Sequence, residues 1–396
     1  QDCAEKENIH TKPLWLSKMP SYISVTDLIN KYNYKKEKFI LNPVIGEYDV
    51  PNMQKQHILT IPFTEEGNLI VYGMAGSGKE NFITTMIYSS SLAYTPAEVN
   101  YYILDFGAEV LRYFDNCPIV GDILYVGDAE KVKNLFKMIS DKIEERKKLF
   151  SSYNGDYVTY CQKSGKTVPN IVIVINNYEA YAESYPEFDD LIIILTRDCI
   201  KYGIYFVFAC NTPDGMRFKL KQNFGQSFVL QQNNEDDYVA ILGNTKKLFP
   251  SKIFGRGLIK KEEVYEFQTA FAGPIDDLSK NIKILNEKLI SIYNSKAPKI
   301  PILPEVVTYD ELDISKVSND EIIIGIDKSD LEICSYNFNK NHINIVTTQD
   351  FTLFNSFINP FVKQFSYKEN YSTIIINADE CEVDKNILSD DTNYVD

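Results

Sequence analysis

The segment 73–80 has the residue types and spacing of a loop that binds phosphate. Gly73, Gly78 and Lys79 fit the pattern G-x-x-x-x-G-K. In such a loop the glycines let consecutive backbone N–H groups surround a phosphate chain, and the lysine adds positive charge. An ordinary glycine-rich turn is the alternative. The residues that we predict to bind a nucleotide are Gly73, Gly76, Ser77, Gly78, Lys79 and Glu80.

Three positions lack the groups that hydrolysis needs. Glu80 stands where Ser or Thr would offer a hydroxyl to Mg²⁺. A working site also needs carboxylates at the end of a central strand, to hold Mg²⁺ and to activate the attacking water. The apolar run 171–175 ends in Asn176 and Asn177, whose amides carry no charge and take up no proton. We therefore predict nucleotide binding without tight Mg²⁺ binding and with weak or absent hydrolysis.

Two nearby acids have alternative roles. Glu179 could replace the missing carboxylates, but its distance along the chain favours a solvated surface acid. An ion pair between Glu80 and Lys79 is one way in which the loop would be held closed without ligand.

The elements that must position these residues alternate between strand and helix. An apolar strand at 68–72 precedes the loop, and a helix-like segment at 81–89 follows it. Helical periodicity predicts a further long helix at 129–150. The other strands that we expect lie at 42–46, 57–62, 100–106, 170–175, 205–209, 227–230 and 257–259. The continuous β-branched runs are typical of buried parallel strands. The fold class is therefore α/β, a P-loop NTPase with a doubly wound parallel sheet.

Composition excludes several classes of protein. Of 396 residues 44% are hydrophobic, and the net charge of −14 argues against a chain that binds nucleic acid. Seven Cys without a C-x-x-C pair and three His make a zinc site improbable and suit a reducing cytosol, so we expect no metal site. The longest apolar runs are far shorter than the roughly 20 residues of a membrane span. The first residue is Gln, which suggests a fragment of a longer protein.

The chain also contains an internal repeat. The segment 16–28 resembles 302–312, Ile45-Gly46 corresponds to Ile324-Gly325, and 68–72 corresponds to 341–347. In the second copy Leu353, Phe354 and Asn355 replace Gly78, Lys79 and Glu80, so the phosphate loop is lost. We expect a first domain at 1–297 and the start of a second, degenerate domain at 298–396. A second strand of that domain is expected at 371–379.

These motifs together resemble the FtsK/SpoIIIE-type motor domains. The resemblance rests on the loop, the end of strand 170–175, and the segments 196–213 and 254–258. It implies a RecA/FtsK-like fold and places Asn211 at the position that senses the γ-phosphate. The repeat, the clasp around Trp15 and the run 45–56 resemble one branch, the EssC/EccC coupling proteins of type VII secretion, in their second and third ATPase domains.

This resemblance implies a motor that uses ATP, sits at the cytoplasmic face of a bacterial membrane and is anchored by parts outside this chain. It further implies other domains and subunits as partners, a hexamer, and secreted substrates of the WXG100 type. Arg197 and Arg256 are candidates for an arginine that reaches a neighbouring subunit's nucleotide, and a structural role is the alternative for either. A DNA translocase and a purely structural docking scaffold are the alternatives. The tyrosines within 177–185 have the spacing of a packed helix face, which we favour over a docking surface.

Overall fold

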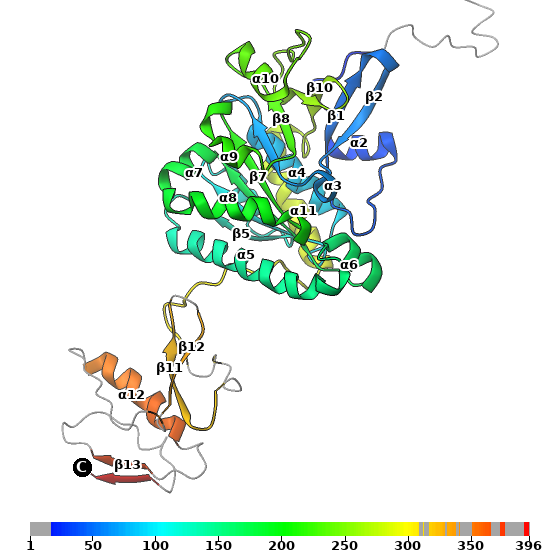
Figure 1. Cartoon of the computed structure of the whole chain (residues 1–396). Coiled ribbons are helices and arrows are strands. Elements are labelled where there is room, and N and C mark those ends of the chain that lie inside the picture. Colours follow the sequence, from blue (N-terminus) through cyan, green and yellow to red (C-terminus); the bar gives the residue numbers. More distant parts are fainter. Residues whose placement is uncertain are drawn as a thin grey trace, which may run out of the picture. The chain divides into compact units, whose positions relative to one another are not determined.

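The structure is a computed structural model that describes residues 17–308, 312, 317–328, 331–337, 340, 351–365, 373–376 and 392–395. The chain divides into two compact units, 1–300 and 301–396 (Figure 1). The division falls three residues after the boundary expected at 297/298.

A mixed sheet forms the centre of the first unit. Within residues 17–300 it has ten strands in the order β2-β1-β10-β9-β8-β3-β7-β6-β4-β5. Neighbouring strands are parallel from β8 to β5 and antiparallel from β2 to β8. The bounds are β1 Val44–Val50, β2 Lys55–Thr60, β3 Leu69–Tyr72, β4 Val99–Asp105, β5 Val120–Leu124, β6 Asn170–Asn176, β7 Ile204–Cys210, β8 Gln226–Leu230, β9 Arg256–Lys260 and β10 Val264–Thr269.

The parallel strands are the ones whose sequence is apolar throughout. Every residue of β4, β6 and β7 is buried, as expected for strands covered by helices on both faces. The α/β fold is confirmed, and the structure adds an antiparallel extension through β9, β10, β1 and β2 to the predicted parallel sheet. Sequence reasoning missed β5 and β10 altogether.

Helices cover both faces of this sheet. A cluster of apolar side chains from α5 to α8 and α10 packs on one face, and a second cluster from α3, α4 and α11 packs on the other (Figure 1). A short helix, α2, packs against β1. The bounds are α2 Val25–Tyr32, α3 Phe63–Glu66, α4 Lys79–Ala93, α5 Ala129–Phe150, α6 Tyr157–Ser164, α7 Tyr178–Ser184, α8 Asp189–Asp198, α9 Phe218–Lys221, α10 Glu235–Leu242 and α11 Leu278–Ile292. The predicted long helix 129–150 is confirmed as α5. None of the helices in the described ranges has both the length and the apolar composition that a bilayer crossing needs.

The second unit repeats a local feature of the first. Its elements are β11 Glu321–Ile326, β12 Ile333–Asn337, α12 Phe351–Phe365, β13 Thr373–Ile376 and β14 Thr392–Val395. Strands β11 and β12 form an antiparallel hairpin with a register shift between Ile323 and Gly325, and β1 and β2 form one with a shift between Val44 and Gly46. The irregularity therefore falls on the same Ile-Gly pair in both copies, which supports the repeat found in the sequence. The expected strand within 371–379 is confirmed as β13, whereas 341–347 lies outside the described residues.

A buried arginine ties α5 to the amino ends of the parallel strands. Arg146 is 2% exposed. Its guanidinium donates to the carbonyls of Tyr202 at 2.6 Å, Gly203 at 3.3 Å and Pro169 at 2.5 Å. Burial lowers the pKa of Arg146 to about 10, which still leaves it protonated at neutral pH. The carbonyls of loops leading into β6 and β7 thus share one charged donor.

We predict that Arg146→Ala lowers the Tm of the full chain by about 5–10 °C, because buried carbonyls lose their donors and a cavity forms. The control is Lys147→Ala, whose side chain is 59% exposed and paired only with Glu144. Thermal unfolding followed by circular dichroism is the measurement. Equal Tm values for the two variants would contradict the structural role of Arg146.

Candidate functional site

The predicted phosphate loop lies between β3 and α4. The strand ends at Tyr72, and α4 begins at Lys79. Gly76 and Gly78 have φ values of +76° and +106°, which L side chains rarely adopt. Ser77 is 1% exposed, and its Oγ has no hydrogen-bond partner among the residues that the structure describes. The loop therefore has the strand–loop–helix geometry that the sequence predicted, with an unsatisfied hydroxyl inside it.

Lys79 makes three hydrogen bonds within this chain. Its ammonium donates to the carbonyl of Gly73 at 2.5 Å, the carbonyl of Met74 at 3.1 Å, and Oδ1 of Asn211 at 3.1 Å. Burial lowers the pKa of Lys79, and the carboxylates of Glu80 and Glu179 oppose that effect. The side chain thus points back over its own loop and across to the end of β7.

The side chain that contacts the Lys79 ammonium is that of Asn211 and not that of Glu80. Strand β7 is the direct neighbour of β3, so its carboxyl end lies beside the loop. Glu80 is half-buried, and no ion pair joins it to Lys79 in the described part of the chain. The ion pair that we considered between Glu80 and Lys79 is thus not formed among the described residues, where loop carbonyls and an amide oxygen accept all three N–H groups of the ammonium.

Asn176 and Asn177 bind the end of β4. Asn176 is 1% exposed, and its Nδ2 donates to Oδ1 of Asp105 at 2.8 Å. Asp105 also accepts from the backbone N–H groups of Gly107 and Leu111, each at 3.2 Å. Asn177 donates to the carbonyl of Phe106 at 3.1 Å. At this edge the amides therefore satisfy a buried carboxylate and a carbonyl, which are roles that carboxylates could not fill.

Glu179 is not the solvated surface acid that we expected. It is half-buried at the start of α7, and its Oε1 accepts from the backbone N–H of Asn211 at 2.6 Å. Its Oε2 is buried without a partner, and a Cβ on Gly215 would lie 2.5 Å from Oε1. The expectation failed because the groups that hold Glu179 belong to the loop after β7, which is distant in sequence. Glu179 thus belongs to the site and positions Asn211.

The two candidate arginines lie in very different places. Arg256 is 4% exposed, and its guanidinium donates to Gln268 at 2.8 Å and to the carbonyls of Met19 and Pro20. Its expected role as an arginine that reaches a neighbour is therefore corrected, because it holds the N-terminal segment of its own unit. The side chain of Arg197 is 62% exposed at the end of α8 and pairs with the adjacent Asp198. Of the two arginines, only Arg197 is exposed to solvent.

The site fits a phosphate chain better than a magnesium ion. Donors for phosphate are present in the Gly76–Gly78 loop backbone, the Ser77 hydroxyl and the Lys79 ammonium. For Mg²⁺ the strand-end acids are replaced by amides, and Asp105 uses both carboxylate oxygens on groups of its own chain. In the described residues no cluster of three or more His, Cys, Asp and Glu has the arrangement of a metal site.

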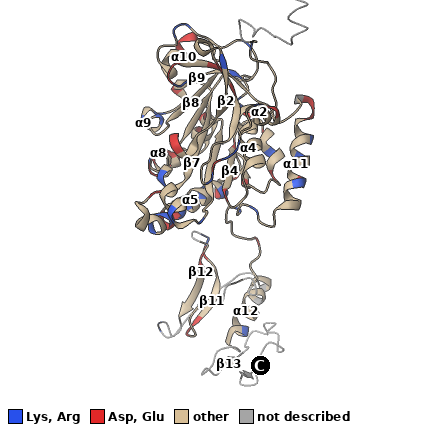
Figure 2. Ribbon diagram, turned by 90° about the vertical axis from the view of Figure 1, so that its right-hand side faces the viewer, with Lys and Arg blue, Asp and Glu red and all other residues tan. Residues whose placement is uncertain are grey.

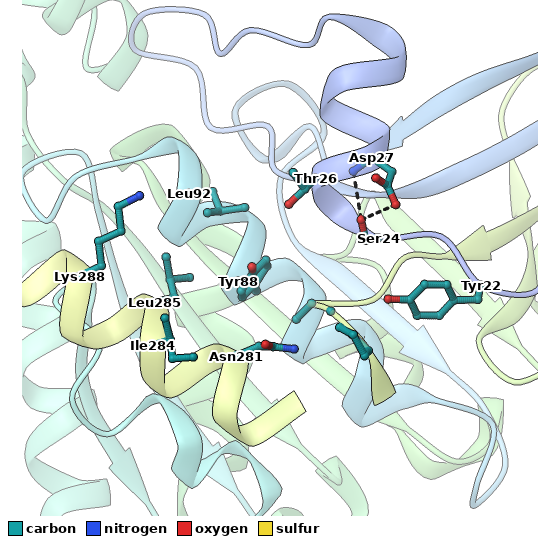
Figure 3. A pocket seen from close by; sticks show the side chains of 13 residues that line it. Tyr22, Ser24, Thr26, Asp27, Tyr88, Leu92, Asn281, Ile284, Leu285 and Lys288 are labelled. Carbon is teal, nitrogen blue, oxygen red and sulfur yellow. Dashed lines mark hydrogen bonds between the residues drawn. The ribbon is translucent and has the colours of Figure 1, made fainter. Parts of the chain in front are cut away.

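A second hollow lies away from this loop. It has a volume of about 440 Å³ and lies between α2, the end of α4, and α11. Figure 3 shows Tyr88 and Leu92 from α4 opposite Asn281, Ile284 and Lys288 from α11, with Tyr22 in the segment before α2. The tyrosines of α7 and of the residue that follows it take no part in such a surface: Tyr178, Tyr181 and Tyr185 are buried, as expected of a packed face.

Comparisons with known proteins give the family of the chain. The model of the FtsK/SpoIIIE family matches residues 31–242, more than half of the chain. The ESX secretion system protein EccC of Geobacillus thermodenitrificans is 29% identical over 266 residues, which cover 66% of this chain and 18% of that relative. The chain thus spans about a fifth of the length of this relative.

Solved structures share the fold over both units. EssC (ATPases 2 and 3) from G. thermodenitrificans superposes with a TM-score of 0.78 at 23% identity, covering 98% of this chain and 73% of that chain. EccC (ATPases 2 and 3) of Thermomonospora curvata, solved in complex with a signal sequence peptide, gives 0.67 at 22% identity, covering 91% and 68%. The tandem arrangement of ATPase modules is thereby supported at the level of fold.

We predict that Asn176→Asp destabilises the chain in a pH-dependent way. The substitution sets a second carboxylate against Oδ1 of Asp105, and their repulsion raises the pKa of the introduced group. Its proton is then bound more tightly in the folded than in the unfolded state. The loss of Tm relative to the parent is therefore small near pH 4 and grows as pH rises.

Thermal unfolding between pH 4 and pH 8 measures this effect. Asn294→Asp is the matched control, because it adds the same acid at an exposed position in the segment after α11. A Tm loss for Asn176→Asp that is the same at both ends of the pH range would show that the contact with Asp105 is not made.

Proposed function

Because the chain belongs to the FtsK/SpoIIIE family, we propose that it is an ATPase-like part of a type VII secretion coupling protein that binds nucleotide for regulation rather than for strong hydrolysis. The observation that carries this proposal is the contact of Lys79 with Asn211, which joins the loop 73–79 to the end of the neighbouring strand. Docking of a secreted substrate belongs to the same proposal.

Nucleotide phosphates would be held by the backbone N–H groups of 76–79 and by the Ser77 hydroxyl. Lys79 would have to leave the carbonyls of Gly73 and Met74 and turn toward the phosphates. A phosphate oxygen is a stronger acceptor for an ammonium than a neutral carbonyl. The exchange is therefore favourable for the lysine, while its contacts within the chain lower the net affinity.

The same exchange would free the side chain of Asn211 while α7 keeps its backbone in place. Oδ1 of Asn211 loses its donor when Lys79 turns away, whereas the backbone N–H of Asn211 stays on Glu179. The side chain of Asn211 then becomes available to a terminal phosphate, while Glu179 keeps the backbone of the β7 loop in place. Glu179 is thus a positioning residue through which the loop after β7 is coupled to the first turn of α7.

Hydrolysis is expected to be weak because no described carboxylate has the role of the missing strand-end acids. Asp105 is fixed by two backbone N–H groups and by Asn176. Glu179 is occupied by Asn211 through one oxygen. Bound ATP would supply a γ-phosphate to be sensed, and the residues present would hold it rather than activate water against it.

The proposal for partners follows from the relatives. Their names place them in ESX and type VII secretion, and the T. curvata EccC was solved with a signal sequence peptide. We extend to this chain a secreted, WXG100-type substrate, assembly with other motor subunits as a hexamer, and attachment to the membrane through parts outside residues 1–396. Arg197 is the remaining candidate for contact with a neighbour's nucleotide.

A DNA-translocating role is disfavoured by charge. The net charge is −14, and Figure 2 shows acidic and basic residues intermixed on α5 rather than gathered by sign. Nucleic-acid binding relies on clustered Lys and Arg that neutralise phosphates. A site that binds only protein stays the alternative to nucleotide binding, and calorimetry separates the two.

We predict that the full chain binds ATP and ADP, that Mg²⁺ leaves both affinities unchanged, and that Lys79→Ala abolishes binding. Asn211→Ala should bind ADP about fivefold more tightly, because ADP then displaces one hydrogen bond fewer from Lys79. ADP is used for this comparison because it has no γ-phosphate for Asn211 to contact. Titration calorimetry with and without EDTA is the measurement.

The matched control is Asn294→Ala, an exposed asparagine in the segment after α11. It should bind ADP as the parent does. No detectable heat for the parent chain even at millimolar nucleotide would refute the nucleotide site and leave the protein-docking scaffold.

A further inference from the structure

Three aromatic rings form a stack beside the phosphate loop. The rings of Tyr22 and Phe271 are 5.1 Å apart at an interplanar angle of 25°, and those of Phe271 and Phe254 are 6.1 Å apart at 25°. Phe271 at the centre is buried. Phe254 and Tyr22 at the two ends are 48% and 41% exposed. We call Tyr22, Phe271 and Phe254 the aromatic stack.

Phe254 stands next to the end of the phosphate loop. A Cβ on Gly78 would lie 3.1 Å from the backbone of Gly255 and 3.5 Å from Cζ of Phe254. The backbone N–H of Gly255 donates to the carbonyl of Ser77 at 3.1 Å. The segment that carries the exposed ring is thus hydrogen-bonded to the loop itself, at the point where α4 begins.

Side chains from the adjoining strands hold this segment in place. Gln231 donates to the carbonyl of Ile253 at 2.9 Å, and Gln268 donates to the carbonyl of Phe254 at 3.0 Å. Arg256 bonds the carbonyls of Met19 and Pro20, just before Tyr22. The stack is therefore positioned by buried polar contacts, so that little ordering is needed when a ligand arrives.

An exposed phenylalanine by itself is common on protein surfaces and needs no function. Phe254 differs by its position. Its ring adjoins Gly78, whose backbone N–H would face phosphate, and its other side contacts the ring of Phe271. A nucleoside attached to phosphates on this loop has its base within reach of the exposed ring. Aromatic side chains bind bases by stacking on their π-faces.

We infer that the aromatic stack is the base-binding part of the site, with Phe254 as the residue that stacks on the base of a nucleoside triphosphate. The inference rests on the proposed function, because it requires phosphates on the loop 73–79. Stacking alone tolerates different bases. The ligand class is therefore a nucleotide whose base is held by its face, with little discrimination between adenine and guanine from Phe254 itself.

The test compares ATP, GTP and inorganic tripolyphosphate binding to the full chain by titration calorimetry. Phe254→Ala should weaken ATP and GTP about five- to tenfold and leave tripolyphosphate unchanged. Phe254→Tyr, which keeps a ring, should bind all three as the parent does. Phe218→Ala removes a 74% exposed phenylalanine from α9 and is the matched control.

The results distinguish a failure of the base-binding role from a failure of the proposed nucleotide site. Tripolyphosphate also reports that Phe254→Ala is folded, because it uses the loop without the stack. If Phe254→Ala binds all three ligands as the parent does, the inference is overturned and the nucleotide site stands. If the parent binds none of them, the nucleotide site fails and the base-binding role fails with it.

Discussion

The hydrogen bonds of one buried ammonium determine how this site is built. Lys79 is 5% exposed, and a buried charge is tolerated only where acceptors surround it. Two loop carbonyls and the Asn211 amide provide them, so the loop after β3 and the loop after β7 are joined through a single side chain. Any phosphate that enters must offer Lys79 better acceptors than these. Under the proposed function, this contact would oppose phosphate binding and would be broken when phosphate binds.

The amides at the end of β6 likewise provide donors to buried acceptors. Asp105 is 1% exposed and needs donors for both oxygens, which Gly107, Leu111 and Asn176 provide. A carboxylate in place of Asn176 would remove a donor and add a like charge. The amide of Asn176 is thus matched to the buried carboxylate that it contacts. Glu179 likewise accepts a hydrogen bond from the backbone of Asn211.

Residue patterns within short segments predicted the helices and strands. The roles of individual side chains depend instead on contacts with residues that are distant in the sequence. The apolar runs of β6 and β7 and the period of α5 gave correct elements because burial acts on each of them directly. The loop 73–79 was predictable because its glycines and lysine are adjacent in sequence. Glu179 and Arg256 were misjudged because their partners lie 32 and more than 200 residues away. No periodicity within a segment indicates such partners, and the aromatic stack likewise joins three separate segments.

In the proposed site, Lys79 exchanges its own loop carbonyls for nucleotide phosphates. A crystal structure of the full chain grown with ATP and EDTA would show this exchange. We expect density for the phosphates on residues 76–79, with the Lys79 ammonium turned from Gly73 and Asn211 toward them. A structure from saturating ATP in which Lys79 keeps its three contacts, with no phosphate on the loop, would refute the nucleotide site.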